Sequence, residues 1–151
     1  MPSAPVDFAL PAHDEQVFRL SEHRGQPVVI YFYPRDNTPG CTTEAQNFRD
    51  LHAEFRKLNC LVVGISRDSI KSHAGFAGKH GLPFPLLSDA DETVCRQFDV
   101  IKLKNLYGKP VLGIERSTFL LSPDGVIVRE WRGVKVAGHA SEVLAAVTDL
   151  R

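Results

Sequence analysis

The chain has 151 residues, of which 43% are hydrophobic and 24% charged, and its 18 basic side chains balance 18 acidic ones. This length and composition suit one globular domain, residues 1–151, with enough residues for a proper core. The charge balance gives no electrostatic reason to expect nucleic acid or an anionic membrane as a partner. The apolar runs are too short to span a bilayer, and the N-terminus has no basic region followed by an apolar stretch, so we expect a cytoplasmic protein.

The first predicted elements are two short strands, over residues 7–10 and 17–20. A run of six apolar residues over 28–33 follows, and it is continuous rather than alternating, as is typical of a strand covered on both faces. The run stops at Pro34, and a loop rich in proline and glycine leads to Cys41.

A helix is predicted to open at Cys41, because apolar side chains then recur with a period near 3.6 residues. These positions are Ala45, Phe48, Leu51, Phe55 and Leu58. Residues 61–65 form a second apolar run, so the stretch from 28 to 65 indicates a strand–helix–strand unit with parallel strands.

The rest of the chain alternates helices with extended pieces. In order, we predict a helix over 66–80, an extended piece over 83–87, a short helix capped by Asp89 or Asp91 and ending at Phe98, a loop over 99–115, a hairpin of strands 117–121 and 126–131, and a final helix over 139–150. This order is that of a thioredoxin-like fold, an α/β protein of three layers with a central mixed sheet.

The cysteines and histidines form no recognisable metal-binding or disulfide pattern. Cys41, Cys60 and Cys95 make no C-x-x-C pair and lack zinc-ligand spacing. The six histidines show no H-E-x-x-H or similar grouping. We therefore expect no structural disulfide framework, no bound metal and no other cofactor.

Cys41 is the candidate nucleophile. Unpaired N–H groups and partial positive charge at a helix N-terminus stabilise an anion, so a thiol there ionises more readily than a free one. The terminus contributes only about 1 kcal/mol, so strong activation requires a cation from elsewhere in the chain. The Thr38 hydroxyl is three residues earlier and is a candidate hydrogen-bond partner for a thiolate or a bound oxygen. Position alone leaves open the alternative of a buried, inert cysteine.

The segment Y-F-Y-P-R-D-N-T-P-G-C-T-T-E-A resembles the P-x-x-x-T-x-x-C signature of peroxiredoxins, and is most similar to the bacterioferritin-comigratory-protein branch, also called Q-type. The resemblance extends over nearly the whole chain, through V-V-G-I-S-R-D, F-P-L-L-S-D, V-C-R-Q-F-D-V and R-S-T-F-L-L-S-P-D-G. It implies a peroxiredoxin fold and a thiol peroxidase that reduces hydrogen peroxide and organic hydroperoxides without a cofactor. The branch is often monomeric, so we expect a monomer.

The resemblance also assigns roles to individual residues. Cys41 matches the peroxidatic cysteine, whose thiolate attacks the hydroperoxide, and Thr38 matches the threonine that hydrogen-bonds the thiolate and the peroxide. Pro34 matches the proline that shields the sulfenic acid. Arg116 matches the arginine that favours the thiolate, and its permanent charge would supply the missing cation. Glu44 corresponds to a glutamate that holds this arginine in several branches, although an acidic residue also favours any first helical turn.

The chain departs from the family pattern at the positions of the resolving cysteine. Gln46 and Ala77 occupy the two places where members of this branch carry one. Cys60 and Cys95 are better interpreted as small core residues than as redox partners. We therefore expect a one-cysteine mechanism, in which an external thiol such as thioredoxin or glutaredoxin with glutathione reduces the Cys41 sulfenic acid.

Other functions use the same cysteine. A redox sensor or holdase-like protein would use oxidation of Cys41 as a signal, and peroxide turnover distinguishes it from an enzyme. A thioredoxin-type disulfide reductase is disfavoured, because the segment T-P-G-C lacks the first cysteine of C-x-x-C. A cysteine hydrolase is conceivable, but no histidine occupies an identifiable base position.

Overall fold

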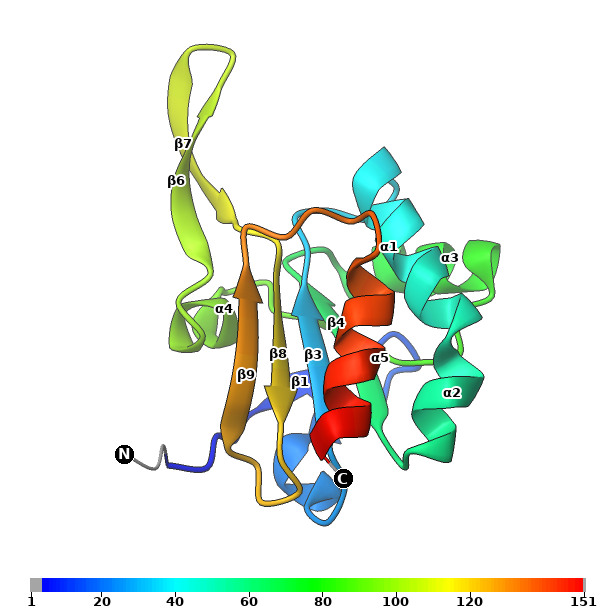
Figure 1. Ribbon diagram of the computed structural model, residues 1–151. Helices are drawn as coiled ribbons and strands as arrows, with labels where there is room; N and C mark the ends of the chain where they lie inside the picture. The colour runs from blue at the N-terminus through cyan, green and yellow to red at the C-terminus, as the bar shows by residue number, and fades with distance from the viewer. Residues whose placement is uncertain (1–3, 151) are drawn as a thin grey trace.

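A mixed sheet of five strands in the order β5-β4-β3-β8-β9 lies at the centre of the structure, a computed structural model that describes residues 4–150 (Figure 1). The strands are β3 (Val28–Phe32), β4 (Leu61–Ser66), β5 (Leu86–Ser88), β8 (Ser117–Leu121) and β9 (Ile127–Arg132). β3 pairs in parallel with β4 and antiparallel with β8. The predicted parallel strand–helix–strand unit is therefore confirmed.

Helices and a small second sheet cover the two faces of the central sheet. They are α1 (Pro39–Asp50), α2 (His52–Lys57), α3 (Ile70–His80), α4 (Thr93–Gln97), α5 (His139–Leu150), the 3-10 turn η1 (Leu20–His23), and the antiparallel pair β1 (Ala9–Pro11) and β2 (Val17–Arg19). Val29 and Tyr31 of β3 pack into one core with α1, α2, α3 and α5. Ile30 and Phe32 pack into a second core with α4, β1 and β2. This alternation explains the unbroken apolar run of β3, and the three layers agree with the expected fold.

The helix predicted to open at Cys41 begins two residues earlier and is divided in two. Pro39 lies at its start, where the missing N–H of proline would have had no helical partner. Leu51 leaves helical geometry, with φ −98° and ψ 3°, and separates α1 from α2. Cys41 nevertheless lies in the first turn of α1, as predicted.

Residues 99–115 are not the loop that we predicted. β6 (Ile101–Leu106) pairs antiparallel with β7 (Lys109–Ile114), and the two-residue turn between them has positive φ at Tyr107 (53°) and Gly108 (77°). The resulting arm stands clear of the body (Figure 1), so most of its side chains are not buried on either face. The alternation that reveals a half-buried strand is therefore missing from this part of the sequence.

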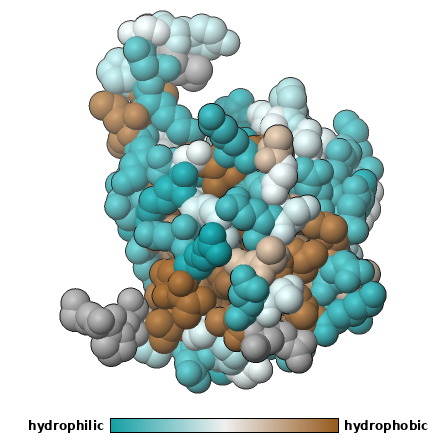
Figure 2. All heavy atoms as spheres, in the orientation of Figure 1, coloured by the Kyte–Doolittle hydropathy of each residue, from teal (hydrophilic) through white to brown (hydrophobic). Residues whose placement is uncertain are grey.

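The arm carries apolar side chains into solvent. Leu103 is 69% exposed, Leu112 54% and Tyr107 95%, and hydrophobic surface is visible on the arm in Figure 2. Contact with the body is concentrated at its base, where Ile114 is fully buried.

The other predicted elements match observed ones within a few residues. α3 begins at Ile70, and the Ser69 side chain caps it. Asp89 and Asp91 both accept hydrogen bonds from first-turn N–H groups of α4, as expected for capping residues. The final hairpin and α5 lie where they were predicted. Within residues 4–150, no helix is long and apolar enough to cross a membrane.

Candidate active site

The loop between β3 and α1 brings Cys41 to the carboxyl end of the central sheet. Tyr33 prolongs the pairing of β3 by donating its backbone N–H to the Ile65 carbonyl at 3.1 Å, and the chain then turns at Pro34. Cys41 follows in the first turn of α1 and is only 1% exposed. The sulfur therefore lies at the positive end of a helix dipole and largely out of water.

The structure places Arg116, the cation expected from the family resemblance, between β7 and β8 and beside Cys41. Its Nη2 donates to the Cys41 sulfur at 3.3 Å, and its Nη1 donates to Glu44 Oε1 at 2.7 Å. Gly40 allows this approach, because a Cβ at that position would lie 3.2 Å from Nη2. One planar guanidinium thus joins the sulfur to a carboxylate one turn along α1.

Burial and the neighbouring charges act in opposite directions on both members of the Arg116–Glu44 pair. Burial raises the pKa of Glu44 to about 7, although the Arg116 charge opposes this shift. Glu44 Oε2 is buried with no hydrogen-bond partner, which adds to the cost of the charged form. Burial disfavours the charge on Arg116, but Glu44 and the Cys41 sulfur outweigh it and raise the Arg116 pKa further. The charge of Arg116 thus lies directly beside the Cys41 sulfur.

Thr38 and Pro34 lie in the same loop but do not contact the sulfur through a hydrogen bond in this structure. The Thr38 hydroxyl donates to the Arg35 carbonyl at 3.0 Å, so its oxygen still offers lone pairs as acceptors. Thr38 is also the N-cap residue of α1, and its carbonyl accepts from the Thr42 backbone N–H at 2.9 Å. Pro34 is half-buried immediately after β3.

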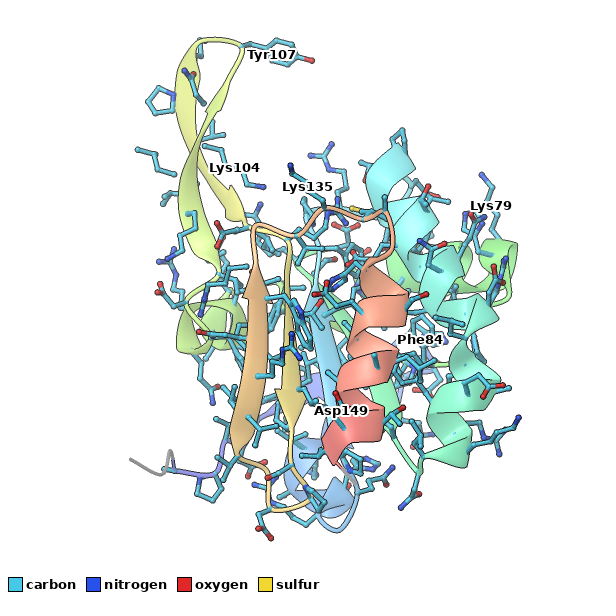
Figure 3. The ribbon with its side chains drawn as sticks, in the orientation of Figure 1. Lys79, Phe84, Lys104, Tyr107, Lys135 and Asp149 are labelled. Carbon is cyan, nitrogen blue, oxygen red and sulfur yellow. The ribbon has the colours of Figure 1, made fainter. Side chains whose placement is uncertain are left out.

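Further basic side chains lie at the same end of the molecule as Arg116. Lys104 of β6 donates from Nζ to the Ile114 carbonyl at the base of the arm. Burial lowers the pKa of Lys104, and the nearby charges of Arg116 and Arg67 lower it further. Figure 3 shows Lys104 and Lys135 at the same end of the molecule, on the arm and on the loop before α5. Of these two lysines, Lys104 is close enough to Cys41 for their charges to interact.

The other two cysteines lie far from Cys41. Cys60 precedes β4 at the amino end of the parallel strands, so the length of β3, roughly 15 Å, separates the two. Cys95 packs in the core on the opposite face of the sheet. Burial raises the pKa of Cys60 to about 12 and raises that of Cys95 also. Neither thiol ionises readily at neutral pH.

Sequence reasoning did not identify a buried polar cluster beside the loop. Asp36, Asp68 and His73 place possible metal-ligand atoms within 4.8 Å of one another, and they are the one such cluster among the described residues. Their polar atoms are engaged in hydrogen bonds within the protein, so we interpret them as a hydrogen-bond network. The sequence contained one indication of this network. The helical spacing of His73 places it with Phe76 and Ala77 on the buried face of α3.

Comparison with known proteins identifies the family. The family model "AhpC/TSA family" matches residues 3–130. Peroxiredoxin Bcp of Xanthomonas campestris pv. campestris is 57% identical over 97% of this chain and 92% of its own length. A structure of the X. campestris bacterioferritin comigratory protein, studied for its alkyl peroxide reduction activity, has a TM-score of 0.90 at 56% identity, covering 94% of this chain and 90% of that one. A variant of PrxQ from Xylella fastidiosa has a TM-score of 0.93 at 45% identity and covers 99% and 96%.

These matches confirm the thioredoxin-like peroxiredoxin fold. They extend over nearly all of this chain and of each relative, and include the loop that carries Cys41. The chain therefore belongs to the AhpC/TSA family and is a peroxiredoxin of the Bcp type, a thiol-dependent peroxidase.

Proposed function

We propose that the protein reduces hydrogen peroxide and organic hydroperoxides through the thiolate of Cys41. The sulfur attacks the terminal oxygen of ROOH, so that an S–O bond forms while the O–O bond breaks. The sulfur becomes a sulfenic acid, and the departing RO⁻ takes a proton from solvent to give the alcohol, or water when the substrate is hydrogen peroxide. The observation that supports this most directly is the 3.3 Å contact from Arg116 to the sulfur. The alkyl peroxide activity of the X. campestris relative supports organic substrates.

The neighbouring residues have distinct roles in this step. Arg116 stabilises the thiolate and the negative charge that develops on the peroxide oxygens. Glu44 fixes the plane of the guanidinium through the 2.7 Å ion pair. Thr38, whose hydrogen is already donated to the loop, accepts a hydrogen bond from the peroxide O–H. Pro34 shields the sulfenic acid from solvent.

We propose that an external thiol recycles the enzyme. A thiolate attacks the sulfenic sulfur to give a mixed disulfide and releases hydroxide, which is protonated to water. A second thiolate then attacks the partner's sulfur, forming the oxidised dithiol and returning the Cys41 thiolate. The positions of Cys60 and Cys95, at the far end and the opposite face of the sheet, support this one-cysteine mechanism. Thioredoxin and glutaredoxin with glutathione are the candidate reductants of what we propose is a cytoplasmic monomer.

Steady-state peroxide consumption with each reductant in turn tests the activity. We expect turnover with at least one of them, on hydrogen peroxide and on an organic hydroperoxide. Cys41→Ser should abolish turnover and leave the circular dichroism spectrum unchanged, whereas the matched variant Cys60→Ser should retain turnover. Equal activity of the two variants would contradict the proposal. Oxidation of Cys41 without turnover by any reductant would instead favour a sensor.

Mass spectrometry after one equivalent of peroxide tests the mechanism. We expect the intact protein to gain one oxygen atom, trapped at Cys41 by a sulfenic-acid reagent. A disulfide joining Cys41 to Cys60 or Cys95, seen as a mass loss of two hydrogens, would overturn the one-cysteine mechanism but not the peroxidase activity.

A further inference from the structure

The loop that precedes Cys41 is tied to α3 through a buried pair of ionisable side chains. Asp36 is 3% exposed and His73 of α3 is fully buried. His73 Nδ1 lies 2.7 Å from Asp36 Oδ2. The two residues are 37 positions apart in the chain, so the contact joins two separate elements of the fold.

The hydrogen-bond partners of His73 determine where its protons lie. Nε2 lies 2.9 Å from the Leu87 carbonyl, which accepts but cannot donate, so Nε2 carries a hydrogen. Nδ1 faces the Asp36 carboxyl group at hydrogen-bond distance, so a second proton lies between these two side chains. The pair is therefore either an imidazolium with a carboxylate or a neutral histidine with a protonated carboxyl group.

The other partners of Asp36 favour the ion pair. The Tyr33 hydroxyl donates to Oδ1 at 2.6 Å and the Ser72 hydroxyl donates to Oδ2 at 2.8 Å. A carboxylate accepts all three hydrogen bonds, whereas a protonated carboxyl group would use one oxygen as a donor. Burial acts to raise the Asp36 pKa, but the hydrogen bonds that it receives outweigh burial and hold the pKa below its usual range. The remaining titratable neighbour is Asp68, whose carboxylate accepts from the Asp36 backbone N–H and whose pKa burial raises.

The same aspartate lies inside the catalytic loop. It is two residues after Pro34 and two before Thr38. Both its side chain and its backbone N–H are bound to groups outside the loop. The next residue, Asn37, has φ of 65°, a left-handed conformation that the surrounding contacts must hold in place. Fixing Asp36 therefore fixes the path of the chain into α1, where Cys41 meets Arg116.

We propose that Asp36 and His73 form a buried ion pair that acts as a positioning pair for the peroxide reaction, holding the loop against α3 so that Cys41 keeps its reactive pose. This inference rests on the proposed peroxidase function. A buried ion pair contributes little net stability compared with an apolar pair of similar size. We therefore expect the benefit of this pair to be a faster formation of the sulfenic acid rather than a larger free energy of unfolding. Small displacements of reacting groups cost large factors in rate.

Asp36→Asn tests the pair, because the amide keeps the shape of the side chain and removes its charge. Asp89→Asn is the matched control: Asp89 is also a fully buried carboxylate, but it accepts hydrogen bonds from α4 rather than from the loop. The readout is the second-order rate constant of sulfenic acid formation, measured by rapid quench at a temperature where both variants are folded. We expect a loss of about ten- to a hundredfold for Asp36→Asn and less than about twofold for Asp89→Asn.

Nitrogen NMR of the His73 ring gives a signature that a merely structural role would not move. We expect both ring nitrogens to be protonated in the parent protein at neutral pH, and only Nε2 to be protonated in Asp36→Asn, because the Leu87 carbonyl retains that hydrogen. A neutral His73 in the parent protein would overturn the ion pair. Equal rate losses in the two aspartate variants, or none in either, would overturn the positioning role.

A milder substitution decides the case if Asp36→Asn does not fold. Ser72→Ala removes one donor to Asp36 from a half-buried position on α3, and we expect about a fivefold loss in the same rate constant. An unchanged rate there would overturn the proposal. A parent protein without peroxidase turnover would instead refute the proposed function, which separates the two failures.

Discussion

The Arg116 guanidinium donates to Glu44 and to the Cys41 sulfur at the same time, and this double contact determines what Glu44 contributes. The guanidinium is planar, so the nitrogen that holds Glu44 also sets the direction of the nitrogen that reaches the Cys41 sulfur. Glu44 is 2% exposed and its second oxygen has no hydrogen-bond partner. The charge of Glu44 therefore lowers the stability of the folded state, whereas its ion pair orients Arg116 toward the Cys41 sulfur.

Glu44→Gln should change how stability depends on pH. The folded pKa of about 7 lies above the ordinary value of 4.5, so the folded state binds this proton more tightly than the unfolded state. Its contribution to stability is fully present below about pH 4.5 and is lost as the pH rises through about 7. The variant should therefore gain about 3 kcal/mol relative to the parent between these limits. Urea unfolding of both proteins from pH 4.5 to 8 measures the difference, and a difference independent of pH would contradict the assignment.

The peroxidase activity of Glu44→Gln should fall under the conditions in which its stability rises. An amide holds the guanidinium less firmly than a carboxylate does, so the rate of sulfenic acid formation should fall at pH 8 while the stability rises. A parallel loss of both would indicate that Glu44 is only a packing residue.

At the scale of elements, β4 provides the space for an aromatic side chain beside the site. Tyr31 on β3 is in register with Gly64 on β4. A Cβ on Gly64 would lie 2.8 Å from the Tyr31 ring and 2.9 Å from Leu86 Cδ2. Tyr31 also stacks on Phe48 of α1, with ring centroids 4.8 Å apart, so this glycine supports the packing that carries α1.

Gly64→Ala should destabilise the protein by about 1–3 kcal/mol, because the added methyl overlaps buried atoms that cannot move freely. Gly78→Ala is the control on α3, where a new Cβ meets nothing within 4 Å. That change should stabilise by about 0.5–1 kcal/mol, since alanine favours the helix. Chemical denaturation of both variants checks the opposite signs, and equal effects would show that the packing at Gly64 is more adaptable than its contacts indicate.

The elements that could be predicted from the sequence are those with a local pattern of apolar residues or with complete burial of their side chains. β3 and the start of α1 followed from an apolar run and a helical period, and the loop between them from its prolines. The β6–β7 arm could not be predicted as strands, because its side chains are mostly exposed on both faces. The Arg116–Cys41 contact spans 75 positions and was expected from the family resemblance, since the residues alone showed only that a cation was needed. Asp36 and His73 belong to separate elements, and only the folded chain brings them together.

At the scale of the whole molecule, the three thiols lie at separate places around the central sheet. Cys41 is at the carboxyl end of the parallel strands, Cys60 is at their amino end and Cys95 is on the opposite face. Under the proposed one-cysteine mechanism, no second thiol among residues 4–150 competes for the sulfenic acid. We expect its half-life to fall in inverse proportion to the concentration of added thiol. Mass spectrometry of samples quenched over time measures this, and a half-life independent of thiol concentration would reveal an internal reaction.

This separation of the thiols has a kinetic consequence. A second cysteine on the same chain would act at a fixed effective concentration, often millimolar, whatever the composition of the surrounding solution. Recycling by a free thiol is instead bimolecular, so the oxidised fraction at steady state depends on the ratio of peroxide influx to thiol supply. Under the proposed mechanism, the oxidised fraction of Cys41 would therefore report the balance between oxidant and reductant around the protein.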